Sequence, residues 1–259
     1  MKICVLIKQV PDKDSPLAIA DNNLSVADNN ITWVSNESDN YALEEALLLK
    51  EAYGGEVVVC TLGRESSKQV LKDAMAKGAD RSIFLSDEQF DSLDILPISK
   101  VFASALKDEN FDLLMSGLQS DDQGNSQLGI LLAELLDMSH ASLVMGTEIL
   151  DDNTIKVKRE LESGWFQWTT LSLPASISIQ SGINTPRYAT LKGIMMVKNK
   201  EVTELNKESM IGLDLSTQIS LKKMYIPEKS KETVFIEGSP DEIVGKLVDV
   251  LKNDIKVMG

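Results

Sequence analysis

A polar, glycine-containing loop between an apolar strand and a helix is the segment of this chain best suited to bind a phosphate group. The loop runs from Gly117 to Ser126 and leads into a helical pattern that begins with Gln127-Leu128-Gly129. A helix N-terminus offers unpaired backbone amides and the positive end of the helix dipole, and both favour an anion. The pattern alone is equally compatible with an ordinary polar loop that caps a helix.

Other residue types that carry chemistry are sparse. His140 is the only histidine, and no serine or cysteine nucleophile stands at a recognisable spacing from it, so a surface or hydrogen-bonded loop role is favoured over catalysis. The sequence contains no zinc-type cysteine spacing, Walker loop or paired-carboxylate motif. Cys4 and Cys60 both lie in apolar, strand-like runs, which favours buried free thiols over a disulfide.

The elements that must position the polar loop form a regular alternation over the first 145 residues. The predicted strands are 3–8, 57–62, 82–85 and 113–116, and the predicted helices are 41–53, 67–77, 93–107 and 127–136. This rhythm predicts an α/β fold with a mostly parallel, doubly wound sheet. Ser66 is expected to cap the second helix and Gly78 to end it with a left-handed residue.

In such a sheet, ligands collect where loops leave the carboxyl ends of the strands. The first strand delivers Lys8-Gln9-Val10-Pro11 to that edge, and the fourth delivers the loop that starts at Gly117. The sequence therefore places both segments at one edge of the sheet.

Beyond residue 146 the pattern changes to a period of two. The runs 142–148, 154–160 and 166–172 predict antiparallel strands at the edge of the sheet, and Ala175 to Ile179 forms a further apolar strand. After about residue 200 the chain is mostly polar and ends in an amphipathic helix over 241–251. We therefore expect a domain over 1–200 and a C-terminal extension over 201–259, which either packs on its own sheet or forms an arm around another subunit.

Composition limits the possible partners. The 259 residues carry a formal net charge of −14, which disfavours nucleic acid and anionic membranes. No run of about 18 apolar residues occurs, and the first residues lack the features of a signal peptide. We expect a cytoplasmic protein.

The most specific motif spans residues 159–195. It combines a charged turn (Arg159-Glu160-Leu161-Glu162-Ser163-Gly164), the run Leu173-Pro174-Ala175, and the run Asn184-Thr185-Pro186-Arg187-Tyr188-Ala189-Thr190-Leu191-Lys192. Pro186 fixes one backbone torsion, and Arg187 and Tyr188 are expected to brace a loop that ends in an exposed apolar-basic tip. This segment resembles, almost position for position, the signature of the beta subunit of electron transfer flavoproteins.

Four further segments carry the same resemblance. They are the opening residues, Asn36 to Ala46, Lys77 to Arg81, and the Gly117 loop, so that the similarity covers residues 1–200, with a weaker continuation. The resemblance implies an adenine-nucleotide-binding, Rossmann-like fold and a heterodimeric electron carrier without catalysis of its own. It also implies a structural AMP held by Leu6, Asn36, Glu37, Ser38, Asp39, Leu62, Gly117, Gln119, Ser120, Asp122, Gln123, Gly124, Asn125, Ser126, Gln127 and Leu128.

One position in this loop departs from the family pattern. Many members have threonine where this chain has Leu128, so backbone amides and Ser126 remain as the phosphate donors. Electron-bifurcating members bind a second FAD here instead of AMP. Their loop pattern is matched only at Gln127-Leu128-Gly129, and Ile130 replaces their proline, which favours AMP.

The resemblance also assigns partner-binding residues. FAD is held by, or shared with, the alpha subunit, whose flavin domain Glu160 is expected to contact. Leu191, with Lys192, Ile194 and Met195, is expected to bind a flavin-containing dehydrogenase that donates electrons. A different class of function is a stand-alone α/β protein that binds ATP or AMP, but such a protein has no need of the 159–195 segment.

Overall fold

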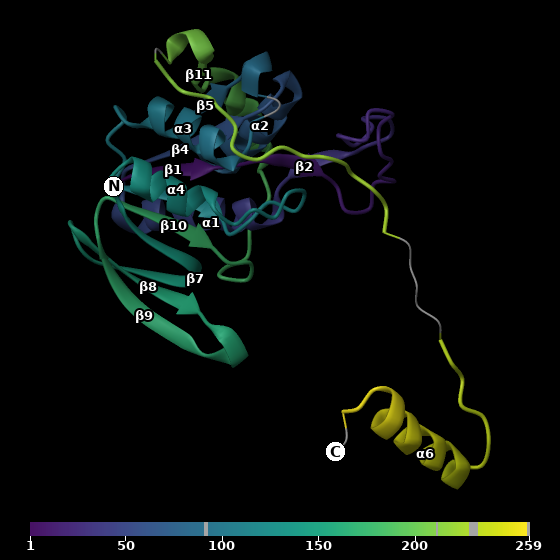
Figure 1. Ribbon diagram of the computed structural model, residues 1–259. Helices are drawn as coiled ribbons and strands as arrows, with labels where there is room; N and C mark the ends of the chain where they lie inside the picture. Colours follow the sequence, from purple (N-terminus) through teal and green to yellow (C-terminus); the bar gives the residue numbers. More distant parts are fainter. Residues whose placement is uncertain (91–92, 211, 228–232, 258–259) are drawn as a thin grey trace. The chain divides into compact units, whose positions relative to one another are not determined.

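The computed structural model describes residues 1–90, 93–210, 212–227 and 233–257, which divide into two compact units, Met1–Lys222 and Lys223–Gly259. The first unit is built on a nine-stranded sheet with the order β11-β5-β4-β1-β6-β10-β7-β8-β9 (Figure 1). Its strands are β1 (Lys2–Leu6), β4 (Glu56–Leu62), β5 (Arg81–Leu85), β6 (Leu113–Gly117), β7 (Ser139–Asp151), β8 (Thr154–Glu160), β9 (Phe166–Ser172), β10 (Ala175–Ile179) and β11 (Val202–Leu205). A separate antiparallel pair joins β2 (Gln9–Pro11) to β3 (Trp33–Ser35).

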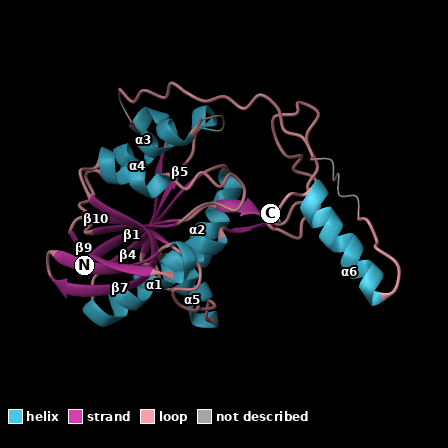
Figure 2. Ribbon diagram, turned by 60° about the horizontal axis from the view of Figure 1, so that its bottom comes forward, coloured by secondary structure: helices cyan, strands magenta, loops and turns pink. Residues whose placement is uncertain are grey.

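Helices cover both faces of this sheet. Figure 2 shows α3 (Ile95–Leu106) and α4 (Leu128–Leu135) on one face, and α1 (Glu37–Tyr53), α2 (Lys68–Lys77) and α5 (Leu191–Met196) on the other. Along β4, Val57 and Val59 enter the core on the α1 side, whereas Val58 and Cys60 enter the core on the α3 side. The central strands are therefore apolar at consecutive positions because both of their faces are buried.

The predicted α/β architecture is confirmed. The pairs among β11, β5, β4, β1, β6, β10 and β7 are parallel, and β7-β8-β9 form the predicted antiparallel edge. The chain passes from β1 outward to β4 and β5 and then returns to place β6 on the other side of β1. The carboxyl ends of β1 and β6 therefore form a topological switch point, where such sheets bind ligands.

Two local predictions about helix starts are wrong. Helix α1 begins at Glu37, four residues before the predicted start, because its first turn is polar and the apolar periodicity begins only at Tyr41. Ser66 does not cap α2, since it lies in a short 3₁₀ turn (Glu65–Ser67) and its hydroxyl donates to Gln9 Oε1 at 3.1 Å. Gly78 ends α2 with a φ of +141°, as predicted.

Three strands and one α-helix were not predicted: the short pair β2 and β3, strand β11 and helix α5. Strand β11 pairs in parallel with β5, beyond the predicted domain boundary at residue 200, and α5 occupies the segment expected to be a loop tip. Both elements are too short for periodicity to reveal them. Further 3₁₀ turns lie at Glu88–Phe90, Glu162–Gly164, Val197–Asn199 and Lys207–Ser209.

The second unit contains the predicted C-terminal helix. Helix α6 (Pro240–Asp249) starts with Pro240 in its first turn, and a π-helical turn (Val250–Asp254) follows it. Ser239 Oγ and its backbone amide both donate to Glu242 Oε2, at 2.9 and 2.8 Å, which fixes the start of the helix. Val244 and Leu247 on this helix are exposed. Across the described part of the chain, no helix has the length and apolar character needed to cross a membrane.

Candidate functional site

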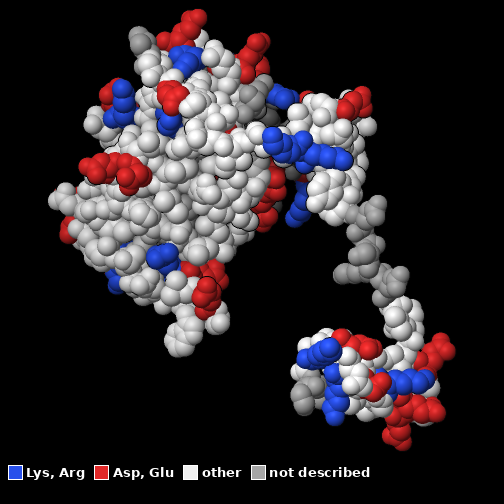
Figure 3. Space-filling view, viewed as in Figure 1, with Lys and Arg blue, Asp and Glu red and all other residues white. Residues whose placement is uncertain are grey.

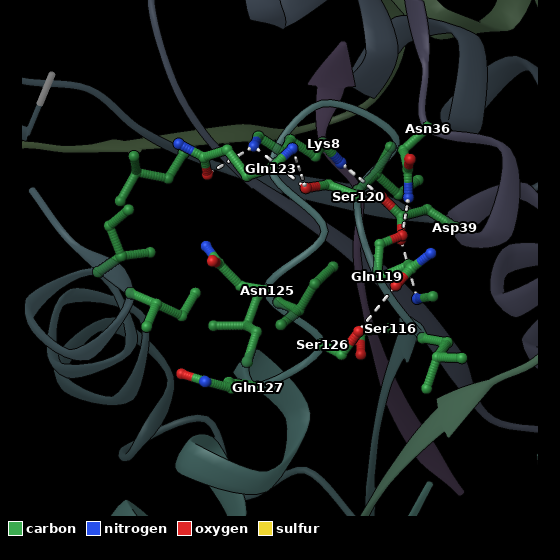
Figure 4. A pocket seen from close by; sticks show the side chains of 18 of the residues that line it. Lys8, Asn36, Asp39, Ser116, Gln119, Ser120, Gln123, Asn125, Ser126 and Gln127 are labelled. Carbon is green, nitrogen blue, oxygen red and sulfur yellow. Dashed lines mark hydrogen bonds between the residues drawn. The ribbon is translucent and has the colours of Figure 1, made fainter. Parts of the chain in front are cut away.

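A cavity opens at the switch point. The empty space around its lining amounts to about 720 Å³, a figure that includes open solvent. Figure 4 shows polar side chains of the loop between β6 and α4 gathered around it. The cavity is lined by residues from β1, α1, β4, α3, β6 and the start of α4.

Asp39 joins the two central strands at the floor of this cavity. It lies in the first turn of α1, is 6% exposed, and accepts hydrogen bonds from the backbone amides of Lys8 and Gly117, each at 2.8 Å. A side chain at Gly117 would collide with Ser38 and Asp39, so this close approach requires glycine. Burial raises the pKa of Asp39 to about 6, although its hydrogen bonds with Lys8 and Gly117 oppose the shift.

Asn36 and Ser38 hold the loop that follows β6. Asn36 Nδ2 and Ser38 Oγ both donate to the carbonyl of Gln119, at 2.9 and 2.8 Å. Asn36 Oδ1 in turn accepts from the amide of Asp121 at 2.9 Å. The start of α1 therefore fixes the path of the polar loop. Asn36 is 0% exposed, and both the amide nitrogen and the oxygen of its side chain form hydrogen bonds.

Lys8 fastens the same loop from the side of β1. Its Nζ donates to Asp122 Oδ1 at 2.8 Å and to Gln123 Oε1 at 3.0 Å, and it lies 3.4 Å from Ser120 Oγ (Figure 4). Desolvation raises the pKa of Asp122, but the charge of Lys8 and its hydrogen bond outweigh it and leave the pKa below its ordinary value. The ion pair therefore ties the loop to the segment that follows β1.

The loop ends with two residues of left-handed backbone conformation just before α4. Gly124 and Ser126 have φ values of +59° and +55°, and Ser126 Oγ donates to Gln119 Oε1 at 2.9 Å. Successive amides in such a turn form a concave anion-binding surface, and the N-terminus of α4 adds its dipole. This end of the cavity is therefore suited to a phosphate.

The opposite end of the cavity is apolar. It is formed by Leu6 and Leu62 from the sheet and by Ile95, Ile98 and Phe102 from α3. A flat aromatic ring is the kind of group that such a surface accepts. The cavity therefore joins an anion-binding end to an apolar end.

The structure brings most of the predicted nucleotide residues together. Twelve of the sixteen line the cavity: Leu6, Asn36, Asp39, Leu62, Gly117, Gln119, Ser120, Gln123, Asn125, Ser126, Gln127 and Leu128. Of the other four, Ser38 and Asp122 support the loop by hydrogen bonds, Gly124 supplies a turn, and Glu37 is exposed beside Asp121. Nucleotide binding by all sixteen stays a prediction.

Several lining residues were missing from the predicted set: Ile7, Lys8, Ile95, Ile98, Phe102, Ser116 and Leu118. The α3 residues lie 33 or more positions from Leu62 and 89 or more from Leu6, the strand residues beside them in the lining, so only the topology reveals them. A polar residue at the end of an apolar strand was the available signal for Ser116.

Arg187 anchors the second predicted functional region, the segment before α5. Its guanidinium forms hydrogen-bonded ion pairs with Glu44 and Glu51 of α1, with Nε 2.8 Å from Glu44 Oε2. The hydrogen bonds that Arg187 donates to Glu44 and Glu51 raise its pKa above the ordinary value. Asn184 Nδ2 adds a bond to Glu45 Oε2 at 3.0 Å. The bracing role predicted for Arg187 is confirmed, whereas that for Tyr188 is wrong, because its side chain is 94% exposed.

Helix α5 presents the predicted partner-binding residues. Thr190 Oγ1 accepts from the amide of Gly193 at 3.0 Å and so caps the helix. A side chain at Gly193 would collide with the carbonyl of Ala76, so α5 packs directly against α2. Leu191, Lys192, Ile194 and Met195 are all exposed, and Leu191 is 76% exposed.

Glu160 ends β8, opposite Phe166 of β9. Its Oε2 accepts from Gln180 Nε2 at 3.0 Å, so part of its hydrogen-bonding capacity is used within the chain. On the same face of β9, Phe166 and Trp168 are 45% and 50% exposed. Figure 3 shows a broad surface around α4 and the edge strands with few charged side chains.

Comparisons with known proteins agree with this arrangement. The model of the electron transfer flavoprotein domain matches residues 23–210. A protein of Methylophilus methylotrophus named electron transfer flavoprotein subunit beta is 33% identical and covers 99% of each chain. The beta subunit of Bacillus subtilis and the mitochondrial beta subunit of Oryza sativa subsp. indica are each 31% identical over 100% of both chains. The chain therefore belongs to the electron transfer flavoprotein family, whose members carry electrons, and is similar to its beta subunits.

Proposed function

We propose that this chain is the AMP-holding beta subunit of a heterodimeric electron transfer flavoprotein. It pairs with an alpha subunit that holds the redox FAD, and it docks a flavin-containing dehydrogenase from which the electrons come. The chain itself contributes a nucleotide-bound base and a docking element. The relatives' shared name, subunit beta, supports the pairing.

The observation that carries the AMP assignment is the two-ended cavity at the switch point. A phosphate fits the amides of Ser126 and Gln127 at the start of α4, and an adenine ring fits the surface formed by Ile95, Ile98 and Phe102. The ribose then lies between these ends, near Gln119 and Asn125. AMP has one phosphate and needs no second flavin subsite, which matches the poor agreement of the loop with the bifurcating pattern.

The docking assignment rests on α5. This helix is held by Arg187 and capped by Thr190, so its backbone loses little conformational entropy when a partner binds. It exposes Leu191, Ile194 and Met195 to solvent. An exposed apolar cluster on a fixed element is typical of a protein-binding site. This cluster is the proposed contact with the dehydrogenase.

The alpha subunit is assigned to a different surface. Phe166 and Trp168 are exposed on β9, the free edge of the sheet, and Lys158 and Lys156 lie over their rings at 4.0 and 4.7 Å. Glu160 borders this surface and is suited to a weak ion pair with the alpha subunit that forms and breaks as the flavin domain moves. The second unit, with exposed Val244 and Leu247 on α6, is the proposed arm that packs on the alpha subunit.

Nucleotide analysis tests this proposal. The chain is purified with its alpha partner, denatured, and the released nucleotides are separated and quantified. We expect about one AMP for each FAD, because one anion-binding turn and one apolar surface accommodate a single mononucleotide. Two FAD with no AMP would identify a bifurcating type, and a chain that retains ATP or AMP without any alpha partner would support a stand-alone nucleotide binder.

A further inference from the structure

Ser116, a residue of the cavity lining, carries a buried hydroxyl for which the described residues provide no partner. It is the next-to-last residue of β6, is 5% exposed, and lines the cavity. Within the described ranges, Ser116 Oγ has no hydrogen-bond partner. Leaving a buried hydroxyl unpaired costs free energy, so a polar group that reaches it from the cavity is stabilised.

The position of Ser116 in the sheet places this hydroxyl at the phosphate end of the cavity. The side chain of Ser116 lies on the same face of the sheet as Leu114, the face that α3 and α4 cover. On the neighbouring strand β10, Ser178 is paired with Ser116. A side chain built on Gly129 would approach Ser116 Oγ to 3.3 Å, so the hydroxyl lies directly beneath the first turn of α4. The apolar lining lies on the other side, where the next strand contributes Leu6.

We propose that Ser116 Oγ donates a hydrogen bond to the phosphate of the bound nucleotide. The inference rests on the proposed nucleotide function and adds a residue that selects for a phosphorylated ligand. Leu128, the first residue of α4, has an apolar side chain and cannot serve as a donor. The hydroxyl of Ser116 reaches the same end of the cavity from the strand below the helix.

The alternative target of the hydroxyl is the adenine ring. The surface formed by Ile95, Ile98 and Phe102 accepts a ring by packing, and it lies on α3 rather than beneath α4. The phosphate is drawn to the amides of the α4 N-terminus, next to Ser116. The two targets can be told apart with adenosine, which has the ring but lacks the phosphate. Loss of a bond to the phosphate weakens AMP binding alone, whereas loss of a bond to the ring weakens the binding of both ligands.

The test compares AMP with adenosine on the heterodimer. Binding of both ligands is measured by displacement of labelled AMP, for the wild type, Ser116→Ala and the matched control Ser176→Ala. Ser176 lies on the adjacent strand and its Oγ donates to the carbonyl of Gly129 at 2.8 Å, so this control removes a nearby hydroxyl that is outside the cavity lining. We expect Ser116→Ala to weaken AMP binding about ten-fold or more and adenosine binding by about two-fold at most. Ser176→Ala should leave the ratio of the two affinities unchanged.

The melting temperature of the nucleotide-free heterodimer gives a second test, because here the substitution should not be destabilising. In the nucleotide-free heterodimer, Ser116→Ala removes an unpaired buried hydroxyl, so its melting temperature should be equal to or higher than that of the wild type. Equal losses for AMP and adenosine, unchanged AMP binding, or a lowered melting temperature without nucleotide would overturn the role of Ser116. If the wild-type complex instead holds a second FAD and does not bind AMP, the proposed function and this inference both fail.

Discussion

At the scale of single residues, Asp39 links the polar loop to the sheet. Its two carboxylate oxygens accept from the amides that follow β1 and that end β6, so one side chain connects both strands at the switch point. The carboxyl group is buried and its pKa is raised to about 6 from an ordinary value of 3.8. The folded protein therefore binds a proton at Asp39 more tightly than the unfolded chain does.

This shift predicts a pH dependence of stability. The favourable contribution of the protonated group is fully present below pH 3.8 and is lost as the pH rises through about 6. The free energy of unfolding of the wild type, relative to Asp39→Asn, should therefore fall by up to about 3 kcal/mol between pH 4 and pH 7. Urea unfolding of the two heterodimers at fixed protein concentration measures this difference. Parallel profiles would show that Asp39 titrates normally.

At the scale of elements, α1 connects the two proposed functional regions. Its first turn carries Asp39 at the cavity, and its later turns carry Glu44 and Glu51, which hold Arg187. Glu44 is 5% exposed, so its charge depends on Arg187 for compensation. The ion pair therefore helps to fix the segment before α5, together with the hydrogen bonds of Asn184.

Arg187→Gln should therefore affect docking and stability but not nucleotide content. Removing the guanidinium leaves Glu44 without its partner, and we expect a loss of about 2–3 kcal/mol in the free energy of unfolding, reduced from the fully buried case by partial solvent exposure. Dehydrogenase affinity should fall as well, because α5 loses its anchor. In the double variant Glu44→Gln/Arg187→Gln, stability should recover while affinity stays low. Recovery of both, or of neither, would contradict the anchoring role.

Leu191→Ala tests the docking surface itself. Burying one leucine in a partner pocket is worth about 1.5–3 kcal/mol, so dehydrogenase affinity should fall about ten-fold or more. The melting temperature and the nucleotide content should change little, because Leu191 is 76% exposed. Leu24→Ala removes another exposed leucine, from the segment between β2 and β3, and serves as the control. A stability loss that matches the loss of affinity would instead mark Leu191 as a packing residue.

The sequence predicts the elements with strong periodicity and misses those fixed by tertiary contacts. The central strands and the four main helices follow from apolar patterns, and the polar loop follows from its glycines and its position after a strand. The first turn of α1 is polar, so apolar periodicity does not reveal it. In the fold, Asp39 of this turn accepts hydrogen bonds from the amides of Lys8 and Gly117. Helix α5 depends on Thr190 and on its packing against α2, which no local pattern contains. The apolar end of the cavity depends on α3 meeting β1 and β4 in space.

At the scale of the whole molecule, the chain exposes apolar surfaces that a partner is expected to cover. Trp165, Phe166 and Trp168 are 73%, 45% and 50% exposed at the free edge of the sheet. An uncovered edge strand with aromatic side chains favours aggregation. In the second unit, Tyr225, Ile226 and Phe235 are also exposed.

The isolated chain should therefore be colourless and poorly stable. Expressed without its alpha partner, it is expected to aggregate and to melt at a lower temperature than the heterodimer, because partner binding stabilises the folded state. Replacing Phe166 and Trp168 with Thr should improve the solubility of the isolated chain and weaken heterodimer assembly. A soluble, yellow, flavin-loaded monomer would contradict the assignment of this surface to the alpha subunit.

We propose that the cavity at the ends of β1 and β6 holds AMP, and a crystal structure of the co-purified heterodimer would identify its occupant. We expect density for one AMP, with its phosphate on the amides of Ser126 and Gln127 and its ring against Ile98 and Phe102. FAD would then be found on the alpha subunit. An isoalloxazine ring in this cavity, or AMP bound elsewhere in the complex, would contradict the assignment of AMP to this cavity.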